Sequence, residues 1–473
     1  MAVLAPSCGL VDNDDRAAPP SSTTSLPAPS TTRGSAGGVE PFEIQELAWE
    51  PCGRVECATL TVPVDWDDPQ GTTPDLAVAR RPATDAEDRL GAVMINPGGP
   101  GGSGVQLIRT VGDSSPLGRL GEQFDLVSFD PRGVGASQGM DCADDETDRF
   151  RLIDPSPDTV AEQDDLDDAA RAVVDACLES DPDLAVALGT NQTVEDIETL
   201  RIALGEDQIN WLGFSYGTYL GLRYADAYPE QVRAVVLDGV VDPSVGLEEL
   251  NTNQARAFEQ VLDDAGLLEQ ARRVVQQVED EPLSGPRGVE IGPAVALTAV
   301  VAATYDEALM DQLGPALDGA EDGNPTALIA LATTYWSFGD FPAYVGTICA
   351  DFALPRGSDE WQALADRMAA AAPLAGASVA NELLPCAYWP DTGAGEAVPI
   401  RATGVDRILV IGNTGDAPTP IAQARAVADQ LDNAVLLRHD GEGHGSFNSS
   451  ECVQDVVLRL FIDLELPAVD ARC

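Results

Sequence analysis

The sequence predicts an α/β domain whose central sheet is mostly parallel and covered by helices on both faces. Two observations support this. Short, continuous apolar runs of strand length recur along the chain, and amphipathic segments of helical length lie between several of them. Strands that are buried on both faces read as continuous apolar runs, and helices connect one parallel strand to the next. With 473 residues, the chain is long enough for one large domain with an insertion, or for two domains.

The apolar runs and the helical patterns can be placed along the chain. Strands are predicted over residues 91–96, 125–129, 209–213, 232–238, 408–412 and 434–439. Helices are predicted over residues 160–178, 194–204, 216–227, 420–431 and 452–464. Two earlier segments, 58–64 and 76–81, are predicted to form an antiparallel hairpin at the edge of the sheet.

The alternation of strands and helices stops between Asp242 and about Asp406, where the sequence is rich in helical patterns. We interpret this stretch as an insertion between two strands. The segment before residue 41 is rich in Pro, Ser, Thr and Gly and has few large apolar side chains, which is typical of a flexible linker. The sequence therefore predicts a signal remnant and linker (1–40), a first core part (41–244), a helical cap (245–400) and a C-terminal core part (401–473).

The charge of the chain argues against nucleic acid and anionic lipid as partners. Asp and Glu number 79 against 27 basic residues, all of them Arg, which gives a net charge of −52. Such a chain is repelled by nucleic acid and by anionic lipid headgroups, so neither is predicted as a partner. The simple interpretation is a solvated acidic surface, as in a salt-adapted protein or one from a GC-rich genome. A field that attracts cationic substrates is the alternative.

The nine cysteines indicate an oxidising compartment. Eight lie in the body of the chain and are candidates for four disulfides, with pairing between neighbours along the chain as our hypothesis: Cys52, Cys57, Cys142, Cys177, Cys349, Cys386, Cys452 and Cys473. The chain has no C-x-x-C motif and only two histidines, so no metal site is predicted.

The ninth cysteine, Cys8, ends the small apolar segment MAVLAPSC, which resembles the tail of a lipoprotein signal. We therefore expect an extracellular protein, either secreted or held at the cell envelope by a lipid on Cys8. Any membrane tether would act only through that residue, because no stretch reaches 18 consecutive apolar residues.

One serine stands in the sequence context of a catalytic nucleophile. Gly213-Phe214-Ser215-Tyr216-Gly217 matches G-x-S-x-G, follows the apolar run INWLG and opens a predicted helix. A nucleophile elbow needs this strand–turn–helix arrangement, with glycines where side chains would clash. A second match centres on Ser137, but no helix follows it, so Ser137 is predicted to be a turn residue.

A base and an acid follow the serine in the chain order of the α/β-hydrolases. His444 lies in the Gly-rich loop GEGHGSF after the last predicted strand, whereas His439 sits at a strand end and is interpreted as a packing or surface residue. Asp416 follows the strand ILVIG and is the predicted acid. Its rival Asp440 is too close to His444 along the chain.

Backbone donors for a tetrahedral oxyanion are predicted at Gly99 and at Tyr216, the residue after the nucleophile. Gly99 lies in the Gly-rich loop 97–104, directly after an early strand. A phosphate-binding loop is the alternative, but the segment has neither the G-x-x-x-x-G-K-[ST] nor the G-x-G-x-x-G spacing. No cofactor is predicted.

Together these segments resemble the secreted actinobacterial tripeptidyl aminopeptidases, relatives of proline iminopeptidase in the α/β-hydrolase superfamily. The resemblance rests on TLTVPVDWDDP after Cys52 and Cys57, and on NPGGPGGSG, FDPRGVGAS, INWLGFSYGTYLGLRYADAYPEQVRAVVLDGVVDP, TICADF, GNTGDAPTP and GEGHGSF. It implies an α/β-hydrolase fold, a helical cap over the active site, and an exopeptidase that releases short peptides, such as tripeptides, from free N-termini.

Position by position, the resemblance implies the same roles as the motifs do. Ser215 is the nucleophile, Asp416 the acid and His444 the base, and Gly99 and Tyr216 supply the oxyanion donors. The usual His before the oxyanion glycines is Pro97 here, which leaves the backbone donors in place.

The substrate ammonium of an aminopeptidase needs a carboxylate partner. The hypothesis is that Asp351 and Glu382 serve this role, since pairing of Cys349 with Cys386 would hold them near each other.

Three other functions stay open. An esterase or lipase would use the same triad, and a proline iminopeptidase-like enzyme would release one residue. A secreted binding protein with a decayed site is the third. Epoxide hydrolase and dehalogenase chemistry is not expected, because those relatives carry Asp at the elbow.

Overall fold

The computed structural model describes residues 42, 44–140 and 142–473. The predicted linker 1–40 and Cys8 lie outside the described residues. Among the helices of the described part, none combines the length and the apolar character that crossing a membrane requires.

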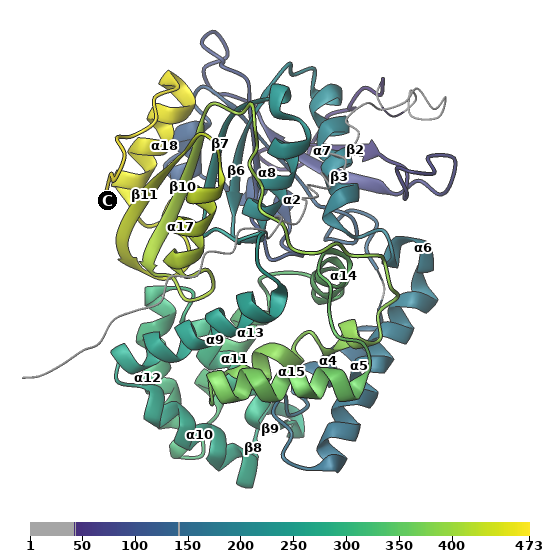
Figure 1. Ribbon diagram of the computed structural model, residues 1–473, viewed down its shortest axis with the longest axis vertical. Coiled ribbons are helices and arrows are strands. Elements are labelled where there is room, and N and C mark those ends of the chain that lie inside the picture. Colours follow the sequence, from purple (N-terminus) through teal and green to yellow (C-terminus); the bar gives the residue numbers. More distant parts are fainter. Residues whose placement is uncertain (1–41, 43, 141) are drawn as a thin grey trace, which may run out of the picture. The chain divides into compact units, whose positions relative to one another are not determined.

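A nine-stranded sheet forms the centre of the fold, in the order β1-β2-β3-β5-β4-β6-β7-β10-β11 (Figure 1). Six strands are parallel: β4 (Ala92–Asn96), β5 (Asp125–Phe129), β6 (Ile209–Phe214), β7 (Val232–Asp238), β10 (Ile408–Gly415) and β11 (Ala434–Glu442). At one edge, three strands pair antiparallel: β1 (Glu50–Pro51), β2 (Glu56–Thr61) and β3 (Asp75–Arg81). The mostly parallel sheet and the edge hairpin that the sequence predicts are both confirmed.

The central strands β4, β5, β6, β7 and β10 form because most of their side chains are buried on both faces of the sheet. In β4, Val93 and Ile95 belong to one apolar cluster, while Ala92 and Met94 belong to another. This alternation is what a strand between two helical layers requires. One layer contains α2 (Gly104–Thr110), α3 (Pro116–Leu120) and α18 (Glu451–Asp463). The other contains α7 (Thr190–Leu204), α8 (Tyr216–Ala227) and α17 (Ile421–Gln430).

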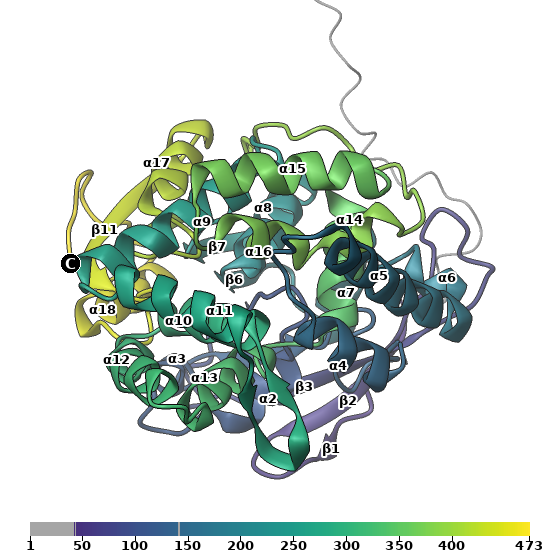
Figure 2. The same ribbon diagram turned by 90° about the horizontal axis from the view of Figure 1, so that it is seen from below.

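A helical segment lies between β7 and β10, beyond the carboxyl ends of the parallel strands (Figures 1 and 2). Its helices are α9 (Leu247–Asp264), α10 (Leu268–Asp280), α11 (Pro293–Ala303), α12 (Glu307–Glu321), α13 (Thr326–Trp336), α14 (Phe341–Asp351), α15 (Ser358–Ala371) and α16 (Gly376–Asn381). Part of this segment, from α9 to α13, has an apolar cluster of its own. We refer to residues 247–387 as the cap. The division at residues 244 and 400 stays a prediction.

Two helices from the β5–β6 connection pack with the cap: α4 (Asp144–Leu152) and α5 (Val160–Ser180) (Figure 2). Asp167 on α5 accepts a hydrogen bond from Tyr388 Oη at 2.7 Å and another from Ser358 Oγ on α15. The wall of the cap therefore includes chain that comes from before β6.

Four disulfides join cysteines that are neighbours along the chain, as the sequence hypothesis had it: Cys52–Cys57, Cys142–Cys177, Cys349–Cys386 and Cys452–Cys473. The third fastens α14 to the short helix η3 (Leu384–Ala387), and the fourth fastens α18 to the last residue. Such bonds are typical of proteins that fold in an oxidising compartment.

Candidate active site

Ser215 occupies a sharp turn between β6, which ends at Phe214, and α8, which begins at Tyr216. Its φ of 54° and ψ of −124° are unusual for a residue with a side chain. The turn is held because the Ser215 N–H donates to the backbone oxygen of Asp238 at 3.0 Å. A Cβ atom on Gly213 would lie 2.3 Å from the Gly217 carbonyl oxygen, so a side chain cannot replace the glycine. The geometry is that of a nucleophile elbow.

His444 and Asp416 meet at the same edge of the sheet. Asp416 follows β10 and His444 follows β11. The Nδ1 atom of His444 lies 3.0 Å from both carboxylate oxygens of Asp416. The Asp416 side chain is fully buried and also accepts the N–H of Gly445 at 3.0 Å. A carboxylate at Nδ1 fixes the proton there and leaves Nε2 free to accept one. Because His444 and Ser215 line the same cavity, the structure brings the three predicted residues to one site.

Two residues that the sequence did not single out support this pair. Thr419 Oγ1 donates to Asp416 Oδ2 at 3.0 Å and lies 3.3 Å from His444 Nδ1. The carboxylate of Asp238 accepts the backbone N–H groups of Ser446 and Phe447 at 2.9 and 2.8 Å. These contacts fix the loop that carries the histidine. Only their positions in the sequence could have indicated Asp238 and Thr419. Asp238 is the last residue of a strand, and Thr419 follows Asp416 by three residues.

The surroundings shift the pKa values of two of these groups. Burial lowers the pKa of His444, but the charge of Asp416 and the hydrogen bond to it outweigh burial, and Asp238 adds to their effect, so the pKa lies above its usual value. Burial raises the pKa of Asp238 to about 6, against the opposing backbone hydrogen bonds from Ser446 and Phe447.

The loop after β4 lies against the elbow. A Cβ atom on Gly98 would lie 2.9 Å from the backbone nitrogen of Tyr216, so this backbone approaches the elbow as closely as glycine permits. Tyr216 is the first residue of α8, where a backbone N–H has no partner within the helix. Gly99 and Tyr216 both line the cavity with Ser215. This is the arrangement that an oxyanion hole needs.

The rival residues lie elsewhere. Ser137 Oγ accepts the N–H of Ala77 at 2.9 Å and donates to the Asp130 carbonyl, which is the contact pattern of a turn residue. His439 Nδ1 lies 3.3 Å from Asn413 Oδ1, and Asp440 pairs with a neighbouring arginine. Among the described residues, none of these three rivals is part of the cavity lining.

A cavity of about 740 Å³ lies between the sheet edge and the cap. Its wall is mostly apolar and aromatic, and Glu382 from the cap is part of it. The Glu382 carboxylate accepts hydrogen bonds from the hydroxyl groups of Tyr335, at 3.0 Å, and Tyr344, at 3.5 Å. Burial raises the pKa of Glu382, and the hydrogen bonds from the two tyrosines and the positive charge of Arg151 oppose that rise.

Asp351 has different contacts from Glu382. Its carboxylate accepts the Thr190 N–H at 2.7 Å and hydroxyl hydrogen bonds from Thr190 and Tyr216. In the described structure it is absent from the cavity lining, whereas Tyr216 is part of it. Asp351 therefore fixes the side chain of Tyr216 from outside the cavity. Of the two acids, only Glu382 lines the cavity.

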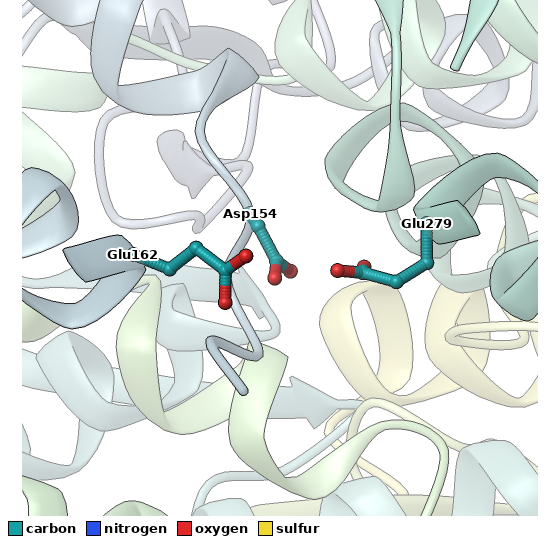
Figure 3. Close-up of side chains that lie close together, drawn as sticks. All are labelled: Asp154, Glu162 and Glu279. Atoms are coloured by element: carbon teal, nitrogen blue, oxygen red, sulfur yellow. The ribbon is translucent and has the colours of Figure 1, made fainter. Parts of the chain in front are cut away.

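Three carboxylates lie close together: Asp154, Glu162 and Glu279 (Figure 3). One oxygen of each lies within 4.8 Å of the others, the only such group of possible metal ligands among the described residues. Glu162 already accepts the backbone N–H groups of Asp158 and Thr159 at the start of α5. Exposed acidic groups often gather without an ion, and we assign no metal here.

The sheet order and the serine at its strand–helix turn place the chain in the α/β-hydrolase fold class. A family model described as the alpha/beta hydrolase fold matches residues 91–279, and one described as TAP-like protein matches residues 372–473.

Three relatives match nearly the whole chain. Serine protease Hip1 of Mycobacterium tuberculosis is 30% identical over 93% of this chain and 93% of its own. Carboxylesterase B of the same species is 31% identical over 97% of this chain and 95% of its own. Tripeptidyl aminopeptidase of Streptomyces lividans is 29% identical over 90% of this chain and 86% of its own. The chain belongs to this family of α/β-hydrolases and is a hydrolase. The resemblance seen in the sequence is confirmed.

The raised pKa of His444 predicts the acid limb of the pH–rate profile. The base must be neutral to accept a proton, so activity falls as the pH falls through this pKa. With a neutral p-nitrophenyl ester, which carries no ammonium, we expect the midpoint of kcat/KM to lie above 6.5. Circular dichroism over the same range separates titration from unfolding. A midpoint at or below 6.5 in folded protein would contradict the account.

The acidic cluster predicts a pH-dependent stability. Burial and the charges of Asp154 and Glu162 raise the pKa of Glu279 to about 7, above its unfolded value near 4.5. A carboxyl group with a raised folded pKa contributes stability at low pH that is lost as the pH rises through about 7. Glu279→Gln should therefore stabilise the protein at pH 8 by on the order of 1 kcal/mol, reduced by solvent screening, and much less at pH 4.

Thermal unfolding at both pH values measures this effect. The matched control is Glu281→Gln, an exposed residue close by that removes the same charge. Equal shifts for the two variants, or a loss of stability for Glu279→Gln at pH 8, would show that the cluster does not act this way.

Proposed function

We propose that the chain is a serine exopeptidase that hydrolyses short peptides, such as tripeptides, from free N-termini. The observation that carries the proposal is a cavity under the cap that is lined by Ser215 and His444 from the sheet edge and by Glu382 from the cap. A cavity that a cap covers in part limits access to Ser215, which favours a chain end over the middle of a folded protein. Relatives named serine protease and tripeptidyl aminopeptidase support the same class of reaction.

The proposed mechanism uses residues of this chain alone. His444 Nε2 accepts the proton of Ser215 Oγ as that oxygen attacks the carbonyl carbon of the scissile bond. Asp416 stabilises the imidazolium that forms. The N–H groups of Gly99 and Tyr216 stabilise the oxyanion, and His444 then protonates the leaving amine. The leaving amine is the shortened peptide, and water then attacks the acyl-enzyme by the same route, which releases the N-terminal tripeptide as a free acid and regenerates Ser215.

The substrate ammonium is assigned to Glu382. A buried carboxylate in a largely apolar wall is costly to keep charged without a cation, as its raised pKa reflects. An ammonium from the substrate supplies that cation at short range. Asp351 is left out of this role because, in the described structure, it is not part of the cavity lining, whereas Glu382 is.

The location and organisation of the chain follow the same proposal. Four disulfides support a secreted or cell-envelope protein, with Cys8 as the candidate for lipidation and residues 1–40 as signal remnant and linker. Residues 41–244 and 401–473 would then form the hydrolase core, and residues 245–400 the cap.

One relative favours a second candidate function. Carboxylesterase B is as similar to this chain as the protease is. The triad itself does not distinguish an ester from an amide, so an esterase would keep the core chemistry and use the cavity for an acyl chain.

Matched substrates separate these functions. We expect free tripeptide p-nitroanilides to be cleaved, N-acetylated ones to resist, and Ser215→Ala to be inactive on all of them. If only a short-chain acyl ester turns over, the chain is an esterase. Equal cleavage of free and acetylated peptides would contradict the exopeptidase proposal.

Glu382→Gln tests the amine site directly. Loss of a charge-assisted hydrogen bond should raise KM for free tripeptides about 10- to 100-fold, with a smaller effect on kcat. The control is Glu248→Gln, an acid on α9 that is exposed and paired with Arg367. An unchanged KM for Glu382→Gln would place the ammonium elsewhere.

A further inference from the structure

One arginine of the cavity wall has no anionic partner. Arg151 near the end of α4 lines the cavity with Ser215 and Glu382. Its Nε atom is buried and, within the described residues, has no hydrogen-bond partner. Its side chain forms no ion pair with any carboxylate of the described chain. In a protein with 79 acidic residues, a mostly buried cation without a carboxylate contact is a site where an anion is expected.

Aromatic rings hold the guanidinium instead. Arg151 Cζ lies 5.0 Å from the ring centroid of Phe341 and 6.0 Å from that of Trp336. Such cation–π contacts fix the position of a guanidinium while leaving its N–H donors free. Burial lowers the pKa of Arg151, with nearby acids opposing, and an arginine stays charged in proteins. The side chain is thus a positioned cation that can donate to a carboxylate with two parallel hydrogen bonds.

Glu382 lies close enough to Arg151 to act on it. The charge of Glu382 raises the pKa of Arg151, and the charge of Arg151 lowers the pKa of Glu382. The two side chains nevertheless form no ion pair in the described structure. Two opposite charges therefore line one cavity with a gap between them. A ligand that carries an ammonium and a carboxylate on the same residue would satisfy both charges at once.

We propose that Glu382 and Arg151 together form a subsite for a doubly charged first residue of the substrate. This rests on the proposed function, which places the substrate ammonium at Glu382. The carboxylate has two chemical sources: the side chain of an N-terminal Asp or Glu, or the α-carboxylate of a residue linked through its side chain, as in a γ-glutamyl peptide. Ser215 still cleaves an amide bond by addition of water, so no further reactant is needed.

The net charge of the protein and the charge of Arg151 act on an acidic peptide in opposite ways and at different distances. A net charge of −52 repels an acidic peptide at long range, but salt screens that field over about 8 Å at physiological ionic strength. Arg151 acts at contact distance inside the cavity, where screening is weak. The preference for a carboxylate therefore belongs to the subsite, and it should persist as salt is added.

The test compares peptides that differ only in the first residue. The full chain is assayed with the p-nitroanilides of Asp-Ala-Ala, Asn-Ala-Ala, Ala-Ala-Ala and γ-Glu-Ala-Ala, at low and at high salt. We expect kcat/KM for Asp to exceed that for Asn about 10- to 100-fold, the range for hydrogen bonds to charged groups. In Arg151→Met the ratio should fall to near one, and in Arg151→Lys it should be intermediate.

Because the readout is a ratio within one variant, a general loss of activity does not affect it. The control is Arg149→Met, a half-exposed arginine on the same helix that pairs with Glu146 at 3.6 Å and should keep the wild-type ratio. A preference confined to γ-Glu-Ala-Ala, lost in Arg151→Met, would keep the subsite and assign the carboxylate to the α position.

Two results overturn the inference. One is the absence of any carboxylate preference in the wild type, with equal rates for Asp-Ala-Ala and Asn-Ala-Ala and no faster cleavage of the γ-glutamyl peptide than of Ala-Ala-Ala. The other is a preference that survives in Arg151→Met. In either case, cleavage of Ala-Ala-Ala that requires a free N-terminus would leave the exopeptidase proposal standing. If acetylated peptides are cleaved as well as free ones, the proposed function fails first.

Discussion

Asp238, the last residue of β7, joins the two halves of the candidate site. Its backbone oxygen accepts the N–H of Ser215, and its buried carboxylate accepts the N–H groups of Ser446 and Phe447 beyond the histidine. The strained turn of the serine and the loop of the histidine are thus fixed to one strand end. Parallel pairing of β4, β6, β7, β10 and β11 brings the loops that carry Gly99, Ser215, Asp416 and His444 to the same edge.

The cap touches each part of that edge. The Tyr305 carbonyl accepts the N–H of His444 at 2.8 Å, and the N–H of Asp340 donates to Gly101 of the loop after β4 at 2.9 Å. Asp351 accepts the hydroxyl of Tyr216. The histidine loop, the oxyanion loop and the elbow therefore each have one polar contact with the cap. A change in the position of the cap would act on the chemistry itself as well as on the shape of the cavity.

The sequence predicts the strands and the elbow well because their signals are local. The six apolar runs correspond to the six parallel strands, and the predicted helix 216–227 is α8. Other features had no local signal. The helix α4 has the sequence DDETDRFRL, in which charged residues dominate and no apolar pattern marks the face that packs against the cap. Neither the helix nor Arg151 was therefore predicted. Asp351 and Glu382 look equivalent beside their cysteines, and only tertiary contacts separate them. Thr419 and Asp238 matter through hydrogen bonds between distant segments, which no spacing rule reveals.

The central claim is that Ser215 is the nucleophile, activated by His444 and Asp416. The most direct measurement treats the full chain with a fluorophosphonate probe and locates the adduct by peptide mass spectrometry. The account predicts a single stoichiometric adduct on Ser215, formed much more slowly in His444→Ala while circular dichroism shows that variant folded. An adduct on Ser137 or another serine, or rapid labelling of Ser215 without the histidine, would contradict it.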